Sequence, residues 1–557
     1  MMLLAVLAFC PPTPAVAQDS TQFTHADTLR GSNGPGRAWW DAAFYDLHVR
    51  VNPADSSIRG WNGITYRVLA PEREMQIDLQ VPLEVDSVVQ EHRKLPYRRD
   101  GNAFFVTLGS RQQAGELRTV TVYYHGKPRV ARRPPWDGGF TWTQDSLGNP
   151  WIATTCEGLG ASVWWPLKDY LADEPDSQRI AITVPDAMTD VSNGRLRSTT
   201  PNGDGTTTWE WFVADPINSY DVVVNAGTYA HWADTLDGEA GKLTRDFWPL
   251  AYHLDAAKRQ WQQATPMLQC FERWFGPYPW YADGYKLVEA PHLGMEHQSA
   301  VAYGNRFRNG YLGFDLSRTG IGTTWDFITV HESAHEWFGN SISVRDHADM
   351  WVHEGFAAYA EGIYTECQLG RTAGAAYLIG VRRSIRNDRP VIGPYGVNGD
   401  GSGDMYPKGA NLLHTVRQIV DDDAKWRGLL RGLNHEFWHQ TVTTRQVEDY
   451  ISRQAGQDLG RVFDQYLRTT QVPEFDYKVE GTTLSYRWGN VVPGFDMPLR
   501  VQVPGLGTRL LHPTTAWQTL AVTSPDAAAL EVDESFYVTA RDVGAAAPGT
   551  GGQGGLR

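Results

Sequence analysis

Short runs of alternating apolar and polar residues fill the chain from residue 39 to residue 250. Examples are "FYDLHVRVN", "TVTVYYHG" and "YDVVVNAG", which are rich in Val and Tyr and are separated by turn residues. A period of two is typical of strands that bury one face. The pattern predicts an N-terminal antiparallel β domain over 39–250. The Ser-, Gly- and Thr-rich residues 18–38 before it are predicted to be a flexible segment.

The apolar period changes near residue 251. The stretch "LDAAKRQWQQATPMLQCFERWFG" repeats apolar residues every three or four positions and ends at Gly276. "TTWDFITVHESAHEWFG" begins with Thr cap candidates and ends at Gly339, and "EGFAAYAEGIYTECQLG" ends at Gly370. This spacing, with glycine at the end, is typical of helices. A mainly helical domain is therefore predicted over 251–470.

Strand patterns return after Pro473. "TLSYRW", "LRVQV" and "WQTLAV" are short β-rich runs, enough for a small C-terminal β-sandwich over 471–543. The Gly-rich residues 544–557 are low in complexity and are predicted to be disordered. The predicted fold class is therefore multidomain α+β.

Charge and hydropathy exclude two classes of partner. The 557 residues carry a formal net charge of -14. Nucleic acid is not expected as a partner, because phosphate binding needs a basic face. The apolar run at the start of the chain is too short to cross a bilayer, and no other segment resembles a transmembrane helix.

The N-terminus resembles a processing signal. The apolar run "LLAVLAFC" is followed by "AVAQDS", which offers a small-x-small cleavage site after Ala17. We therefore expect a signal peptide at 1–17 and a secreted or periplasmic protein, although the segment has no Lys or Arg at its start. Cys10 suggests a lipid anchor as the alternative, but the bulky Phe9 before it disfavours lipoprotein cleavage.

The chain has four cysteines, Cys10, Cys156, Cys270 and Cys367. Removal of the predicted signal peptide leaves three, so at least one thiol is expected to be unpaired. None of the spacings is typical of a thiolate metal site. A disulfide framework is not expected.

One predicted helix contains the pattern H-E-x-x-H, formed by His331, Glu332 and His335. The two histidines are four residues apart, so both imidazoles lie on one face of the helix and suit Zn²⁺. Glu332 lies beside this pair and can act as a base on the attacking water. A catalytic zinc needs a third ligand, and Glu354 follows His335 after 18 residues, in the next predicted helix. A polar helix face would explain the first motif alone, but it predicts nothing at Glu354.

Together these stretches resemble the M1 family of zinc aminopeptidases, a member of the gluzincin group. "HESAHEWFGN" and "WVHEGFAAYAE" follow the family pattern of H-E-x-x-H, 18 residues and Glu. "HLGMEHQSAVAY" resembles the G-x-M-E-N loop, and "MYPKGANLLH" the Y-x-K-G motif. "FGPYPW" and "TTCEGLGASVWWPLKDYLADEPD" also resemble family segments. The resemblance runs from about residue 40 to 470 and implies a thermolysin-like catalytic domain.

The resemblance implies a metal site and catalytic residues. One Zn²⁺ ion is expected to be held by His331, His335 and Glu354. Glu332 is expected to be the general base, and Tyr406 to stabilise the oxyanion through its phenol O–H.

The resemblance also implies a site for the free α-amino group of a peptide. Glu296 is expected to pair with the substrate ammonium, within a loop that includes Gly294 and Met295. Glu157, from the β domain, is expected to be the second carboxylate of this site. His297 and His353 stand where the family usually has Asn. His353 is expected to support the site without binding the metal.

The predicted function is hydrolysis of the N-terminal peptide bond of peptides with a free N-terminus. A zinc endopeptidase is one alternative, since it would not need amine-binding carboxylates, and a catalytically idle peptide-binding protein is another. Epoxide hydrolysis occurs in one branch of the family, but that branch has a second Tyr where this chain has Gly401. The short C-terminal part predicts a more open cleft than in relatives with a long helical domain. The sequence predicts no oligomeric state.

Overall fold

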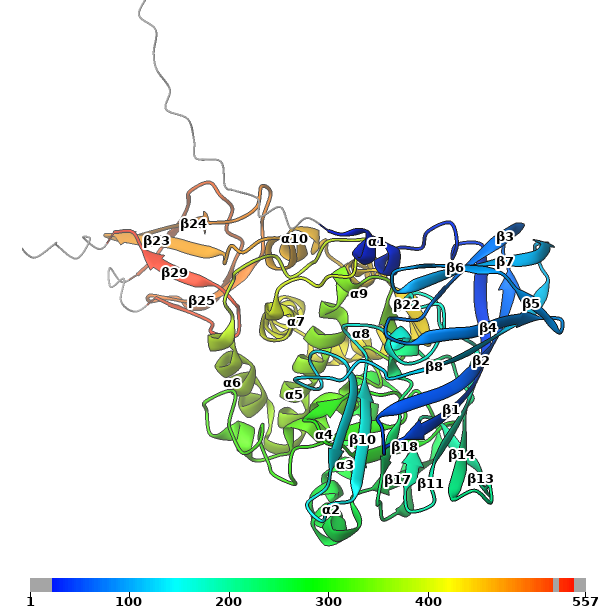
Figure 1. The fold of residues 1–557 in the computed structure, drawn as a ribbon. Coiled ribbons are helices and arrows are strands. Elements are labelled where there is room, and N and C mark those ends of the chain that lie inside the picture. The colour runs from blue at the N-terminus through cyan, green and yellow to red at the C-terminus, as the bar shows by residue number, and fades with distance from the viewer. Residues whose placement is uncertain (1–22, 524–529, 545–557) are drawn as a thin grey trace, which may run out of the picture.

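The computed structural model describes residues 23–523 and 530–544 (Figure 1). Strands, then helices, then strands follow one another along this part of the chain, which confirms the predicted multidomain α+β class. The predicted signal peptide at 1–17 and all but the first residue of the predicted tail at 544–557 lie outside the described residues.

The N-terminal part is built on an eight-stranded sheet. β1 pairs antiparallel with β2 and parallel with β11, so the sheet is mixed, and the predicted purely antiparallel arrangement is wrong at this pair. A parallel pair needs a long crossover connection, which local alternation does not reveal. In spatial order the strands are β13 (Arg195–Pro201), β14 (Thr206–Val213), β11 (Ser177–Pro185), β1 (Trp40–Asn52), β2 (Ser57–Val68), β8 (Leu117–Gly126), β4 (Glu84–Gln90) and β5 (Arg93–Leu95).

Two smaller sheets complete the N-terminal part. Buried residues of both sheets, among them Met75, Phe104 and Ile152, belong to one hydrophobic core with the large sheet. The first contains β3 (Glu72–Asp78), β7 (Ala103–Gln112) and β6 (Tyr97–Asp100), and the second contains β12 (Thr189–Val191), β15 (Asn225–Gly227), β10 (Pro150–Thr155) and β9 (Gly139–Gln144).

The segment before β1, for which flexibility was predicted over 18–38, contains a helix from residue 25 onward. Helix α1 (His25–Gly31) begins with a capping box between Thr24 and Asp27. Arg37 is fully buried and donates to the carboxylate of Asp78 over 2.5 Å. A local cap and a buried ion pair fix a segment whose composition alone favours a loop.

A five-stranded sheet contains strands from both sides of the domain boundary expected at residue 250. β17 and β18 run parallel, as do β18 and β20, and the short β19 pairs antiparallel with β20 at the edge. The strands in order are β16 (Trp232–Gly238), β17 (Gly241–Trp248), β18 (Tyr285–Glu289), β20 (Val301–Tyr303) and β19 (Gly294–Met295).

Helices dominate from residue 254 to residue 468. As predicted, α3 and α5 end immediately before Gly276 and Gly370. α4 differs from its prediction, because Asp326 rather than a Thr caps it, and it ends at Ala334 before reaching Gly339. The helices are α2 (Leu254–Gln260), α3 (Ala264–Phe275), α4 (Phe327–Ala334), α5 (Trp351–Leu369), α6 (Arg371–Val381), α7 (Pro407–Val420), α8 (Asp423–Glu436), α9 (Thr444–Ala455) and α10 (Gly460–Arg468), with a small parallel pair of β21 (Ile342–Val344) and β22 (Gln440–Val442) beside them.

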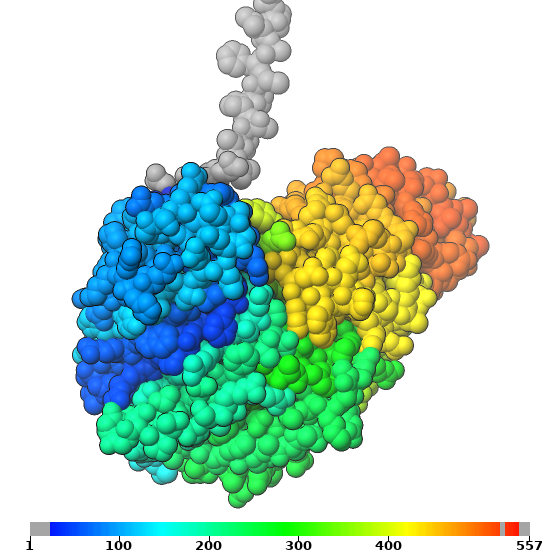
Figure 2. All heavy atoms as spheres, turned by 90° about the vertical axis from the view of Figure 1, so that its right-hand side faces the viewer, coloured from blue at the N-terminus to red at the C-terminus, as the bar shows by residue number. Residues whose placement is uncertain are grey.

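The C-terminal strands form two sheets. Their buried side chains continue the core of the helical part, and in Figures 1 and 2 they lie on its side away from the N-terminal sheet. One sheet contains β27 (Gln518–Ala521), β24 (Thr483–Gly489), β23 (Glu474–Glu480) and β29 (Thr539–Asp542), and the other contains β26 (Gly507–Leu511), β25 (Leu499–Val503) and β28 (Glu531–Val532).

A disulfide joins Cys270 of α3 to Cys367 of α5. Cys156 is buried and unpaired within residues 23–523 and 530–544, which agrees with the expected free thiol. The disulfide itself was not predicted. Of the helices described, none is long and apolar enough to pass through a bilayer.

Candidate metal centre and active site

Three side chains converge where α4 meets α5. The Nε2 atoms of His331 and His335 lie 3.4 Å apart, and each lies 3.4 Å from Oε2 of Glu354. All three side chains are buried. The three residues predicted from the sequence as metal ligands therefore place one atom each at the corners of a triangle with equal sides.

This triangle fits one zinc ion. Zinc lies about 2.0–2.2 Å from imidazole and carboxylate ligands, which separates neighbouring tetrahedral ligand atoms by about 3.3–3.5 Å. Oε2 of Glu354 is buried and has no hydrogen-bond partner among the described residues, which is costly for a carboxylate unless a cation binds it. Two imidazoles and one carboxylate are also the ligand types of open catalytic zinc sites.

Both imidazoles are oriented through their other nitrogen. Nδ1 of His331 donates to Glu361 over 2.7 Å, and the hydroxyl of Tyr377 donates to the second oxygen of Glu361 over 2.6 Å. Nδ1 of His335 donates to the carbonyl of Phe338 over 2.9 Å. These bonds leave both Nε2 lone pairs for the metal.

Glu361 and Tyr377 were missed by the sequence interpretation. A signal existed for Glu361, since it lies seven residues after Glu354 and therefore on the same face of α5.

Glu332 lies beside the ligand triangle, on α4. Burial raises the pKa of its carboxyl to about 7, against the opposing effect of the imidazoles of His331 and His335. Gly294 on β19 leaves room for it, because a Cβ at Gly294 would lie 2.6 Å from Oε1 of Glu332. A carboxyl with this pKa is suited to proton transfer near neutral pH.

Tyr406 reaches the ligand triangle from the start of α7. It follows a 3₁₀ turn, η8 (Gly403–Met405), and its hydroxyl donates to Oε1 of Glu354 over 2.9 Å. Burial raises the pKa of Tyr406 well above its usual value, so the phenol keeps its proton. It is therefore a fixed O–H donor next to the metal group.

A second group of polar side chains adjoins the first. Glu157, Glu296 and His353 each offer an atom within 4.8 Å of the others, and Glu296 also lies within that distance of atoms of Glu332 and His335. Burial and the neighbouring Glu296 carboxylate raise the pKa of Glu157. We call Glu157 and Glu296 the carboxylate pair.

The carboxylate pair is supported by a residue that the sequence interpretation missed. Tyr220, in the 3₁₀ turn η2 (Ser219–Asp221), donates its hydroxyl to Oε1 of Glu296 over 3.1 Å. Asn340 donates to the backbone carbonyl of Glu296 over 2.8 Å. The N-terminal part of the chain thus supplies Glu157 and Tyr220 to a site whose other residues follow residue 290.

Met295 differs from its neighbours in this site. Its side chain is buried in the core shared with the N-terminal sheets, so only its backbone on β19 is left for a substrate. Gly294, by contrast, lies directly against Glu332. The other residues predicted for the site are brought together by the structure.

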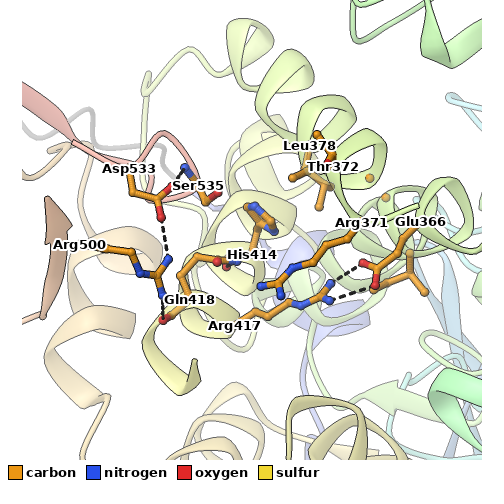
Figure 3. Close-up of a pocket in the computed structure, with 14 residues that line it drawn as sticks. Glu366, Arg371, Thr372, Leu378, His414, Arg417, Gln418, Arg500, Asp533 and Ser535 are labelled. Carbon is orange, nitrogen blue, oxygen red and sulfur yellow. Dashed lines mark hydrogen bonds and ion pairs between the residues drawn. The ribbon is translucent and has the colours of Figure 1, made fainter. Parts of the chain in front are cut away.

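A separate cavity of about 310 Å³ lies between α6, α7 and the C-terminal strands (Figure 3). His414 projects into it and is buried, and Arg417 on the same helix forms a two-bond ion pair with Glu366. None of its lining residues belongs to the metal group or the carboxylate pair.

Known proteins resemble this chain in sequence. Residues 260–466 match the peptidase family M1 domain. Human aminopeptidase B is 24% identical over 449 residues, which cover 73% of this chain and 64% of that protein. Aminopeptidase Ey of Gallus gallus is 24% identical over 297 residues, covering 49% of this chain and 30% of the relative. The chain thus spans less than two thirds of the length of these curated relatives.

Solved structures share the fold. The M1 zinc metallopeptidase from Deinococcus radiodurans superposes with a TM-score of 0.67 at 21% identity, over 79% of this chain and 95% of that one. A mutant of that enzyme bound to a Tyr-Ser-Ala substrate superposes with a TM-score of 0.66 at 21% identity, over 79% and 96%. The chain therefore shares its fold with these metallopeptidases, and its residues 260–466 match the peptidase family M1 domain in sequence.

Proposed function

We propose that the protein is a zinc-dependent aminopeptidase that removes the first residue from peptides with a free N-terminus. The observation that carries the proposal is the position of the carboxylate pair directly beside a triangle of zinc ligands. A metal site alone suits many hydrolases. A pair of carboxylates next to it, of which Glu296 is buried and Glu157 half-buried, suits a substrate that brings a positive charge close to the scissile bond.

His331, His335 and Glu354 would hold the ion. When bound, zinc supplies Lewis acidity, which polarises a carbonyl and lowers the pKa of water. Glu361 and the carbonyl of Phe338 hold the two imidazoles in the tautomer that this role needs.

Glu332 acts as the general base in this proposal. Its carboxylate takes a proton from the attacking water and then gives it to the leaving amine as the peptide bond breaks. The raised pKa supports both steps, since the group can hold and release a proton near neutral pH.

Tyr406 stabilises the charge that develops on the former carbonyl oxygen. Its O–H is fixed near the metal group by its bond to Glu354 and, in the reaction, exchanges this carboxylate for the oxyanion. Because its raised pKa keeps the phenol protonated, Tyr406 can donate a hydrogen bond to the oxyanion without losing its proton, which favours this role.

The carboxylate pair, Glu157 and Glu296, binds the substrate ammonium. Gly294 lets the edge strand β19 approach Glu332 closely and exposes its backbone, with that of Met295, to an extended peptide. A substrate can extend beyond its first residue only away from the carboxylate pair, which favours cleavage at the first peptide bond.

We also propose that the protein works in an oxidising compartment. The pairing of Cys270 with Cys367 supports this location, because disulfides persist mainly outside the cytosol. It agrees with the signal peptide expected at 1–17.

The decisive experiment compares Tyr-Ser-Ala with N-acetyl-Tyr-Ser-Ala as substrates. We expect cleavage of the free peptide only, lost with a chelator and restored by zinc. Glu332→Gln should keep its zinc and lose about 10²–10⁴-fold in kcat. Equal cleavage of both peptides would indicate an endopeptidase. Zinc-loaded protein that binds but does not cleave peptides would indicate a binding protein. An active Glu332→Gln variant would refute the role of Glu332.

A further inference from the structure

We propose that His353 is a positioning residue for the carboxylate pair, and that its Nδ1–H, which has no partner among the described residues, donates to this pair in the substrate-bound protein and orients it toward the substrate ammonium. The inference rests on the proposed function, since it assigns a part of the amine site. It concerns a side chain that neither binds the zinc nor touches the scissile bond.

His353 lies on α5, immediately before the zinc ligand Glu354, and it is fully buried. Its ring offers a nitrogen within 4.8 Å of a carboxylate oxygen of both Glu157 and Glu296. Glu157 comes from the loop after β10 and Glu296 from the segment after β19. His353 therefore lies where three distant parts of the chain meet.

One hydrogen bond fixes the tautomer of His353. The backbone N–H of Val344, on β21, donates to Nε2 over 3.0 Å. A nitrogen that accepts from a backbone N–H must carry a lone pair, so the ring is neutral and its proton is on Nδ1. The ring therefore has one hydrogen-bonding group left, the Nδ1–H donor.

That donor is unused within the described residues. Nδ1 of His353 is buried and has no hydrogen-bond partner there. Buried donors are nearly always satisfied, and a ring nitrogen of His353 lies within 4.8 Å of an oxygen of each member of the carboxylate pair. The arrangement excludes His353 as a ligand of a second metal between the two carboxylates, because the free nitrogen has no lone pair to offer.

A donor at this place has a specific effect on the amine site. Two carboxylates so close together repel one another, and each can rotate away from the other. One N–H that binds an oxygen of the pair fixes its orientation and leaves the remaining lone pairs for the ammonium. His353 cannot accept from the ammonium itself, so it acts through Glu157 and Glu296.

Two substitutions separate the ends of the ring. In His353→Asn the amide NH₂ falls near the position of Nδ1, so the donor is kept and the acceptor for Val344 is lost. In His353→Gln the amide oxygen reaches the position of Nε2, so the acceptor is kept and the donor is lost. A residue that merely braces β21 would be replaced better by Gln, and a donor to the carboxylate pair would be replaced better by Asn.

The first measurement is the kinetics of Tyr-Ser-Ala cleavage by zinc-loaded protein. We expect KM within about twofold of the wild type for His353→Asn and about tenfold higher for His353→Gln, with kcat changed much less, because the lost bond serves ammonium binding. A larger KM for His353→Asn than for His353→Gln, or equal KM values for both, would overturn the proposal.

The second measurement does not need catalysis. L-tryptophan and N-acetyl-L-tryptophan are titrated calorimetrically into the zinc-loaded wild type and both variants. We expect only the free amino acid to bind, about tenfold more weakly to His353→Gln and unchanged to His353→Asn. Equal affinities of the wild type and His353→Gln for L-tryptophan would overturn the role of His353. A wild type that binds tryptophan in this way but cleaves no peptide overturns the proposed enzyme activity alone.

The third measurement is the zinc content of the purified protein. We expect one ion per chain in the wild type and in both variants. A second ion in the wild type that is lost in His353→Asn and His353→Gln would make His353 a ligand and overturn the donor role.

Discussion

Gly355 on α5 and Gly409 on α7 face each other where the backbones of the two helices come into direct contact. A Cβ built on Gly409 would lie 2.8 Å from the Cα of Gly355, closer than real Cβ contacts allow. α5 carries Glu354, and α7 begins directly after Tyr406. The close approach of the two helices therefore sets the 2.9 Å contact between Tyr406 and Glu354.

Gly409→Ala should lower both stability and activity. An added methyl group must push α7 away from α5, which costs about 1–3 kcal/mol of unfolding free energy and moves Tyr406 away from the metal group. Helix propensity alone would favour Ala by about 1 kcal/mol. Urea unfolding and the kcat of peptide cleavage are the measurements.

Gly428→Ala on α8 is the matched control, since a Cβ there meets nothing within 4 Å. It should raise stability by about 0.5–1 kcal/mol and leave kcat unchanged. Equal changes in unfolding free energy and kcat in Gly409→Ala and Gly428→Ala would contradict the role of the contact between Gly355 and Gly409.

Glu361 should control zinc affinity without binding the metal. Loss of its carboxylate in Glu361→Ala frees Nδ1 of His331 and should weaken zinc binding about 10–100-fold, as measured by competition with a chromogenic chelator. Tyr377→Phe is the control, because it keeps the carboxylate and removes only one bond to it. A larger loss of zinc affinity in Tyr377→Phe than in Glu361→Ala would contradict this prediction.

The metal centre could be predicted from the sequence because its information is local. His331, Glu332 and His335 share one helix, and the helical period places the two imidazoles on one face. Glu354 lies at the start of the next helix, where the spacing also points to it. These four residues could be predicted without knowing how the chain packs.

The supports of the site could not be predicted in this way, because they are non-local. Tyr220 meets Glu296 across 76 residues, and Cys270 meets Cys367 across 97. The parallel pairing of β1 with β11 likewise joins strands separated by most of the N-terminal part. Apolar periodicity identifies which residues are buried, but not which buried residues meet.

Gly294→Ala should impair catalysis more than binding of the metal. The new Cβ would lie 2.6 Å from Oε1 of Glu332 and 2.8 Å from a methyl group of Ile328, so Glu332 must move. We expect kcat to fall about 10–100-fold with zinc content unchanged, because a misplacement of about 1 Å costs rates of this order.

Gly403→Ala is the control for this change, since its Cβ meets nothing within 4 Å although it lies close to Tyr406 in the chain. It should keep kcat within about twofold. An unchanged kcat in Gly294→Ala would show that Glu332 does not need its observed position.

The disulfide between Cys270 and Cys367 should stabilise the helical part against unfolding. It closes a loop with a sequence separation of 97 and ties α5, which carries Glu354 and Glu361, to α3. Reduction should therefore lower the free energy of unfolding by about 2–4 kcal/mol, because the unfolded chain regains freedom. Urea unfolding of the full chain with and without a reductant measures this difference.

The double variant with Cys270→Ala and Cys367→Ala should have a free energy of unfolding lowered to the same extent, and reductant should no longer change it. Cys156→Ala, which alters the buried free thiol, should keep the full response. A double variant that still loses stability on reduction would mean that another bond, not this one, stabilises the fold.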